Sequence, residues 1–121
     1  MNSSIFINSK GFVEIKNINI VTPEDAMECG REYINFATKL GDEGKKTNML
    51  LDSSNVEDWG EGTFPLVLII FQKIDFHKMA TFGANEKISQ LQREIIVNAK
   101  IENKAKVFKT REEAEDWLEK E

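Results

Sequence analysis

The residues best suited to chemistry are short polar groups that directly follow predicted strands. Asp52-Ser53-Ser54 follows one apolar segment, Gly83-Ala84-Asn85 follows a second, and Thr110 follows a third. In an open α/β sheet, ligands bind beyond the carboxyl ends of the strands, close to helix amino termini. These residues could therefore form one rim, where backbone N–H groups around Asn85 could hold an anion. The alternative is structural, with Asn85 and Thr110 capping helices and Ser53 completing a turn.

Three single residues also have chemistry of their own. Trp59 lies in a loop rich in acids and glycine, where it could cover a pocket, anchor a partner or fold back on the core. His77 is the only histidine and Cys29 the only cysteine. A metal site needs several ligands and a general base needs a positioned partner, so neither residue predicts such a site. We therefore expect a protein that is not an enzyme and that holds no metal or other cofactor.

Composition limits the classes of protein that this chain can belong to. With 121 residues, 40% apolar and 31% charged, it is predicted to form a single folded domain over residues 1–121. The net charge of −5 argues against binding to nucleic acid or to an anionic lipid surface. Every apolar run is shorter than the roughly 20 residues of a membrane helix, and the first residues do not resemble a signal peptide. A cytoplasmic location and no stable membrane insertion are the expectation.

The elements that must position these residues alternate between strands and helices. A hairpin is predicted from strand-like segments at 5–7 and 12–16, which flank turn residues 8–11 and could extend through Ile18 and Ile20. Thr22-Pro23 then starts a helix that ends before Gly41. The later segments are strands at 47–51, 78–82 and 104–108, a helix around 88–99, and a last helix that begins at a Thr110–Glu113 capping box. The predicted fold is α/β, in the order ββαβαβαβα, with a mostly parallel central sheet.

One segment is unusually apolar, the block from Phe64 to Phe71. Its β-branched residues would suit a central strand, but Thr63 and Pro65 favour a helix start, and a βαβ crossover fits between strands about 27 residues apart. If Phe64, Leu68 and Phe71 face the sheet, then Val67 and Ile70 must face elsewhere. The sequence therefore predicts a helix whose surplus apolar residues line an interface or an apolar cavity.

The order of elements and three segments resemble the SpoIIAA-like proteins, relatives of the STAS (sulfate transporter and anti-sigma factor antagonist) domain. The segments are 50–52 at a strand end, 78–83 in the next strand, and 106–118, in which Ala114, Trp117 and Leu118 form one helix face. The resemblance implies a compact α/β domain that acts as a non-catalytic switch, binding partner proteins and sometimes nucleotides or lipids.

Some STAS proteins work through a phosphorylated serine in an Asp-Ser-Ser-Gly stretch at a helix start. Asp52-Ser53-Ser54 lies at a strand end instead, so the resemblance does not make it that site. The corresponding region falls near 60–63, which holds no serine, and Thr63 is the adjacent hydroxyl. Thr63 therefore joins the rim candidates, without support for a phosphoserine switch.

The leading functional expectation is a STAS-like binding module that associates with protein, as a homodimer or with a regulatory partner. The interface would be the helix around 64–71, through Phe64, Val67, Ile70 and Phe71. The alternative is a small carrier of an apolar or lipid-like ligand, as in the related CRAL-TRIO lipid binders, with the same residues as pocket walls.

Overall fold

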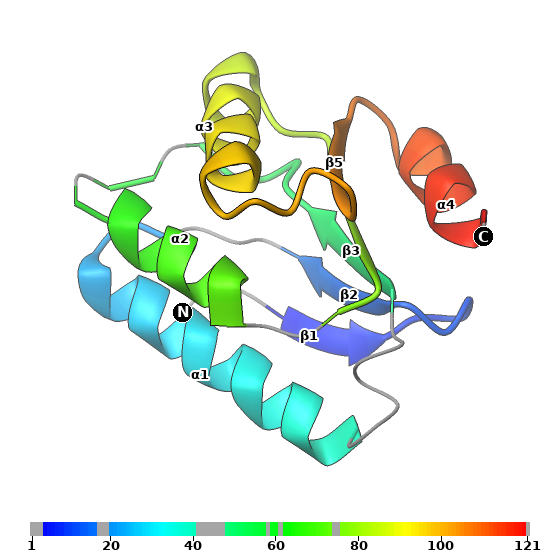
Figure 1. The fold of residues 1–121 in the computed structure, drawn as a ribbon, viewed down its shortest axis with the longest axis horizontal. Coiled ribbons are helices and arrows are strands. Elements are labelled where there is room, and N and C mark those ends of the chain that lie inside the picture. The colour runs from blue at the N-terminus through cyan, green and yellow to red at the C-terminus, as the bar shows by residue number, and fades with distance from the viewer. Residues whose placement is uncertain are drawn as a thin grey trace.

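The five strands form one mixed sheet in the order β1-β2-β3-β4-β5 (Figure 1). The computed structural model describes residues 4–16, 20–40, 48–57, 59–60, 62–73 and 76–120. β1 pairs antiparallel with β2, and all the other neighbours are parallel. The strands are β1 (Ser4–Ile7), β2 (Val13–Lys16), β3 (Asn48–Asp52), β4 (Lys78–Phe82) and β5 (Ala105–Phe108).

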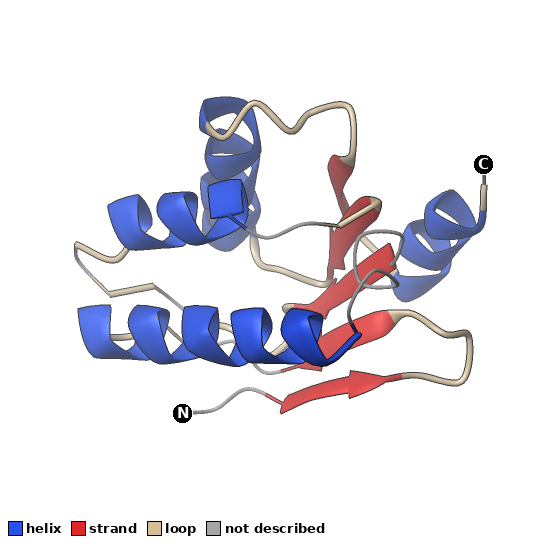
Figure 2. Cartoon of the chain, turned by 60° about the horizontal axis from the view of Figure 1, so that its bottom comes forward, coloured by secondary structure: helices blue, strands red, loops and turns tan. Residues whose placement is uncertain are grey.

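Four helices cover the two faces of this sheet unequally. α1 (Pro23–Leu40), α2 (Phe64–Lys73) and α3 (Glu86–Asn98) form a layer on one face, and α4 (Arg111–Glu119) lies on the other (Figure 2). The strand register explains this division, because Ile15, Leu51 and Thr81 share the face toward the three helices. Glu14, Leu50 and Ala80 share the face toward α4.

Each face has its own apolar core. The larger cluster lies under α1, α2 and α3 and includes Ile15, Leu51 and Ile95. The smaller cluster lies under α4 and includes Leu50, Phe82 and Leu118. Leu50 is completely buried although α4 is the sole described helix on its side.

Polar side chains cap the amino-terminal ends of α1 and α4. The Thr22 hydroxyl accepts a hydrogen bond from the Asp25 backbone N–H, and the Asp25 carboxylate accepts from Val21 and Thr22. Thr110 accepts from the Glu113 backbone N–H and donates its hydroxyl proton to the Glu113 carboxylate. Such reciprocal caps satisfy donors that the first helical turn leaves unpaired.

The predicted order of elements and the mostly parallel sheet are confirmed, and the apolar block is a helix. Residues 17–19 lie outside the described part of the chain, so an extension of the hairpin there is not described, and Ile20 is a buried core residue outside any strand.

For Val67 the interface alternative is wrong and the cavity alternative holds. Its side chain is 3% exposed and lines a small cavity inside the chain. The α2 helix lies between α1 and α3, so neighbouring helices cover flanks that a helix packed on a sheet alone would expose. Val67 therefore needs no outside cover.

Candidate functional site

The predicted rim forms in part, at the carboxyl ends of β3 and β4. Ser54 donates to Asp52 Oδ1 from its backbone N–H at 3.1 Å and from its hydroxyl at 2.5 Å. Gly83 has a φ of +79° and packs directly on Ser54, where an added Cβ would lie 3.0 Å from the Ser54 Cβ. Asp52, Ser54 and Gly83 are neighbours, but the Ser54 donors are already bonded to Asp52.

Asn85 uses both ends of its side-chain amide for structure. Its oxygen caps α3 by accepting from the Ile88 backbone N–H at 2.9 Å. Its Nδ2 donates to the Glu57 carbonyl at 3.1 Å and to the Val56 carbonyl at 3.4 Å, which ties the loop after β3 to the start of α3. The contacts of Asn85 and Thr110 therefore agree with their interpretation as helix caps.

Two predicted rim residues are not on an accessible rim. Ser53 and Thr63 are each 1% exposed. The Ser53 hydroxyl lies 3.1 Å from the Thr81 hydroxyl and accepts from Gln92 Nε2 at 3.0 Å. The Thr63 hydroxyl donates to the Gly60 carbonyl at 2.7 Å. Modification of Thr63 would require its side chain to leave the core. The prediction that Ser53 and Thr63 lie on an open rim is therefore wrong.

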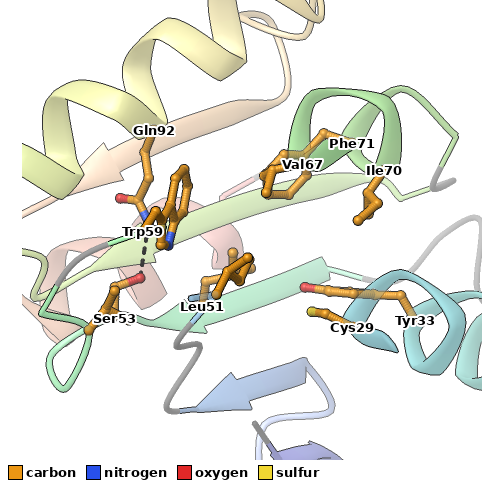
Figure 3. Close-up of a pocket in the computed structure, with 11 residues that line it drawn as sticks. Cys29, Tyr33, Leu51, Ser53, Trp59, Val67, Ile70, Phe71 and Gln92 are labelled. Carbon is orange, nitrogen blue, oxygen red and sulfur yellow. Dashed lines mark hydrogen bonds between the residues drawn. The ribbon is translucent and has the colours of Figure 1, made fainter. Parts of the chain in front are cut away.

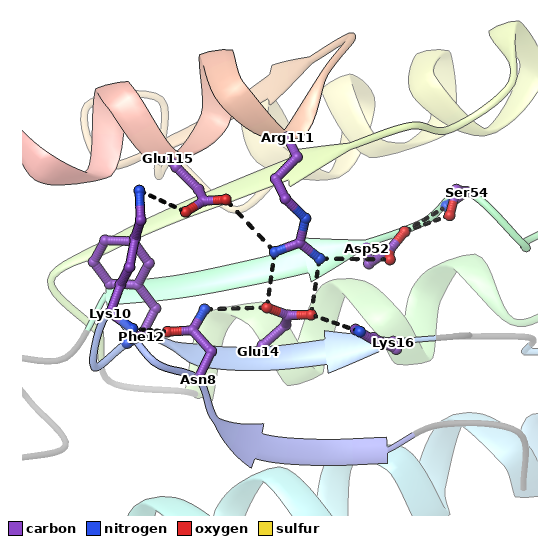
Figure 4. A network of polar contacts seen from close by, with 9 residues as sticks. All are labelled: Asn8, Lys10, Phe12, Glu14, Lys16, Asp52, Ser54, Arg111 and Glu115. Atoms are coloured by element: carbon purple, nitrogen blue, oxygen red, sulfur yellow. Dashed lines mark hydrogen bonds and ion pairs between the residues drawn. The ribbon is translucent and has the colours of Figure 1, made fainter.

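A polar network that sequence reasoning missed lies beside Asp52, on the α4 face (Figure 4). Arg111 binds the Glu14 carboxylate with two nearly parallel bonds of 3.0 and 2.9 Å, and its Nη2 lies 3.8 Å from Asp52 Oδ2. Asn8 donates to Glu14 at 3.1 Å, and Lys16 Nζ lies 3.4 Å from it.

Glu14 is 2% exposed, and Arg111 is the main reason that its pKa falls from 4.5 to about 2. Both carboxylate oxygens of Glu14 are paired, and the network connects β2 to α4. The available signal was a glutamate at the centre of the apolar strand 12–16, a position that needs a buried partner.

Trp59 folds back onto the core, which was one of the three possibilities for this loop. It is half-buried and lines a cavity of about 30 Å³ between α1, α2, α3 and β3 (Figure 3). Gly60 holds the loop in place, because its N–H donates to the Ile20 carbonyl at 2.8 Å. A Cβ at Gly60 would lie 1.6 Å from the Val21 carbonyl oxygen, so the backbones approach too closely for another residue.

Cys29 lies in the larger core and His77 lies on the surface. Cys29 is 4% exposed, and burial is the main reason that its thiol pKa rises to about 12. A thiol at that pKa supplies almost no thiolate near neutral pH. His77 is exposed and directly precedes β4. Within the described ranges, histidine, cysteine and carboxylate side chains form no group of three that could hold a metal ion.

An apolar groove lies on the outer surface between α1 and α2. It has a volume of about 350 Å³, and Met27, Ile34 and Ile69 are 57%, 49% and 44% exposed. Arg31 and Lys73 also line it. The close packing of the two helices depends on Gly30, where an added Cβ would lie 2.9 Å from Ile70 Cγ1.

The groove changes the set of interface candidates. Ile70 lines the groove, whereas Phe64 and Phe71 do not, and all three are partly buried and pack against the larger core. Sequence reasoning missed Met27, Ile34 and Ile69. The signal was the seven-residue spacing of Met27 and Ile34 on a helix whose buried stripe lies at other positions, such as Ala26 and Tyr33.

The described helices all lack the combination of length and apolarity that crossing a bilayer requires.

A five-stranded sheet with three helices on one face and one on the other, and an order of ββαβαβαβα, defines a STAS-like fold. The SpoIIAA-like family model matches residues 12–119, and the chain belongs to that family. The crystal structure of an uncharacterized protein of the DUF3478 family from Shewanella loihica PV-4, with a SpoIIAA-like fold, is similar. It matches with a TM-score of 0.64 and 18% identity, over 96% of this chain and 91% of that one. No curated protein matches the sequence.

Proposed function

We propose that this chain is a cytoplasmic, non-catalytic STAS-like module that acts by protein–protein association, and that its partner is a second copy of itself. The observation that carries this proposal is the groove between α1 and α2, where Met27, Ile34 and Ile69 are exposed together. Contiguous apolar surface of this kind is characteristic of interaction sites. The surface includes α2, the helix that the sequence already favoured for association.

Covering the groove would contribute favourably to association. Fully burying an apolar side chain contributes on the order of 1.5–3 kcal/mol. Met27, Ile34 and Ile69 keep about half of their surface in water, so each would contribute a fraction of that figure. In a twofold dimer the same residues are buried twice, once on each copy.

Charge favours a second copy as the occupant. Glu24 and Glu28 lie in the first half of α1, whereas Arg31 and Lys73 border the groove. α1 and α2 run side by side in the same direction (Figure 1). A twofold axis across the groove would set the helices of the two copies antiparallel. The acidic end of each α1 would then face the basic edge of the other groove.

Sedimentation velocity over a micromolar concentration range tests the proposal. We expect a dimer for the natural chain and a monomer for Ile69→Asp. The matched control is Val97→Asp on α3, because Val97 is 59% exposed and lies outside the groove. This control should remain a dimer. A stable monomer of the natural chain, or a dimer of Ile69→Asp, would overturn the proposal.

A charge reversal tests the orientation separately. Lys73→Glu should weaken dimerisation, and Glu24→Lys combined with Lys73→Glu should restore it, because the two reversals re-create opposite charges. Circular dichroism checks that the variants keep their helices. Failure of the double variant to recover would contradict the antiparallel arrangement while leaving dimerisation itself intact.

The second candidate function is that of a carrier for an apolar or lipid-like ligand. The volume of the same groove and its two basic side chains favour this role. A volume of about 350 Å³ lies within the usual range of small-molecule sites, and Arg31 and Lys73 could pair with a carboxylate head group. Native mass spectrometry of gently purified protein distinguishes the candidates. Co-purifying lipid with a monomer would favour the carrier, and a ligand-free dimer the association module.

A further inference from the structure

Two of the residues that line the small cavity under α2 each carry a buried polar atom that association through the groove does not use. They are the Tyr33 hydroxyl from α1 and Oε1 of Gln92 from α3. Tyr33 is 5% exposed and Gln92 is 6% exposed. Among the residues that the structure describes, neither atom has a hydrogen-bond partner.

Such atoms are rarely left unsatisfied in a folded protein. A buried polar group without a partner has lost its hydrogen bonds to water and gained none in return. Gln92 is already half-satisfied, because its Nε2 donates to Ser53 Oγ, which is itself paired with Thr81. Figure 3 shows Gln92 reaching from α3 toward Ser53, and Tyr33 reaching from α1 toward Leu51.

The walls and the size of the cavity limit what could supply the missing partners. None of the described residues that line it is charged, and its other walls include Ile20, Val56 and Val67. A charged ligand would therefore be buried without compensation. The volume is about 30 Å³, which holds one or two water molecules and is far too small for a lipid chain.

We propose that this cavity is a structural hydration site, occupied by one or two ordered water molecules. Water donates a hydrogen bond to Gln92 Oε1. It also forms one hydrogen bond with the Tyr33 hydroxyl, which can act as donor or acceptor. The chain of hydrogen bonds that links Gln92, Ser53 and Thr81 is then extended by water toward α1. Ile70 lines both this cavity and the outer groove, so the water lies directly behind the proposed association surface.

The single tyrosine of the chain makes a direct solution test possible. In protein labelled only at tyrosine with carbon-13, the ring protons of Tyr33 give one isolated set of NMR signals. We expect cross-relaxation between these protons and water, with the sign that marks a long-lived bound molecule. Absence of that signal, or electron density for an organic molecule in a crystal structure of the cavity, would overturn the proposal.

A thermal unfolding measurement gives an independent test, because the sign of its outcome differs between a wet and a dry cavity. If water bonds the hydroxyl, Tyr33→Phe removes a hydrogen bond and should lower Tm by roughly 3–6 °C. If the cavity is dry, the same change removes an unsatisfied group and should raise Tm. A rise in Tm overturns hydration, whatever the oligomeric state of the protein.

Discussion

Arg111 and Glu14 join two segments that are 97 positions apart in the sequence, through paired bonds of 3.0 and 2.9 Å. Arg111 opens α4, and Glu14 lies in β2 at 2% exposure. The guanidinium carbon of Arg111 also lies 4.9 Å from the centre of the Phe82 ring, so the arginine contacts both the ion pair and the smaller core. The pair therefore links α4 to β2.

Breaking this pair should destabilise the fold strongly. Arg111→Met leaves the Glu14 carboxylate buried without its main partner, and such losses cost about 3–5 kcal/mol in free energy of unfolding. Glu14→Leu combined with Arg111→Met should cost less than Arg111→Met alone, because no buried charge remains. Urea denaturation of the single and double variants measures both effects.

The control for that experiment is an exposed ion pair in the same region. Lys10 Nζ lies 3.1 Å from Glu119 Oε1, and both side chains are nearly half exposed. Glu119→Gln should therefore change the free energy of unfolding by less than about 1 kcal/mol. Equal effects of Arg111→Met and Glu119→Gln would show that burial of Glu14 contributes nothing.

Stability should depend on the ionisation of Glu14 at acid pH. Its pKa is lowered from 4.5 to about 2 in the folded state, so the folded state favours the ionised form. The resulting stabilisation, up to roughly 3 kcal/mol, is complete above pH 4.5 and is lost as the pH falls toward 2. Urea unfolding at several pH values between 7 and 2 should give a steeper acid loss for the natural chain than for Glu14→Gln. Parallel curves would contradict the shifted pKa.

Two substitutions of Asn85 should separate its two structural roles. Asn85→Ala removes the helix cap and the loop tie together, and a lost cap costs about 1 kcal/mol. Asn85→Asp keeps an acceptor for the Ile88 N–H but loses the donor to the Val56 and Glu57 carbonyls. Hydrogen exchange in residues 53–57 should therefore accelerate in both variants. Thr110→Ala is the control, since it removes a cap elsewhere and should leave that exchange unchanged.

Gly60→Ala should displace the loop that positions Trp59. The new Cβ would meet the Val21 carbonyl oxygen at 1.6 Å, so one of the two backbones must move. In a Trp117→Phe background, where Trp59 is the sole remaining tryptophan, we expect a red-shifted emission maximum as the indole becomes more exposed.

Gly11→Ala is the matched control for the loop experiment. Gly11 has a φ of +82° and open space where a Cβ would lie, so an alanine there costs only about 1–2 kcal/mol of backbone strain. Its fluorescence should match that of the parent variant. A Gly60→Ala spectrum that also matches the parent would contradict the close approach at Val21.

The sequence alone predicted what short-range chemistry controls. Thr22, Asn85 and Thr110 act on backbone groups within about one helical turn, and their caps form as their residue types imply. The order of strands and helices followed for the same reason, because hydrophobic periodicity and turn residues act over a few positions. The parallel sheet could then be predicted from the alternation of elements.

The tertiary structure alone decided which of these residues are accessible and which pair. Ser53 and Thr63 are buried and Val67 is covered because three helices lie side by side on one sheet face, and their rotation depends on packing across the fold. Glu14 meets Arg111 because β2 lies beside β3 and α4 covers that face, a relation between residues 97 positions apart. Local patterns specify elements, whereas the sites between elements depend on sheet register and helix packing, which no short stretch of sequence contains.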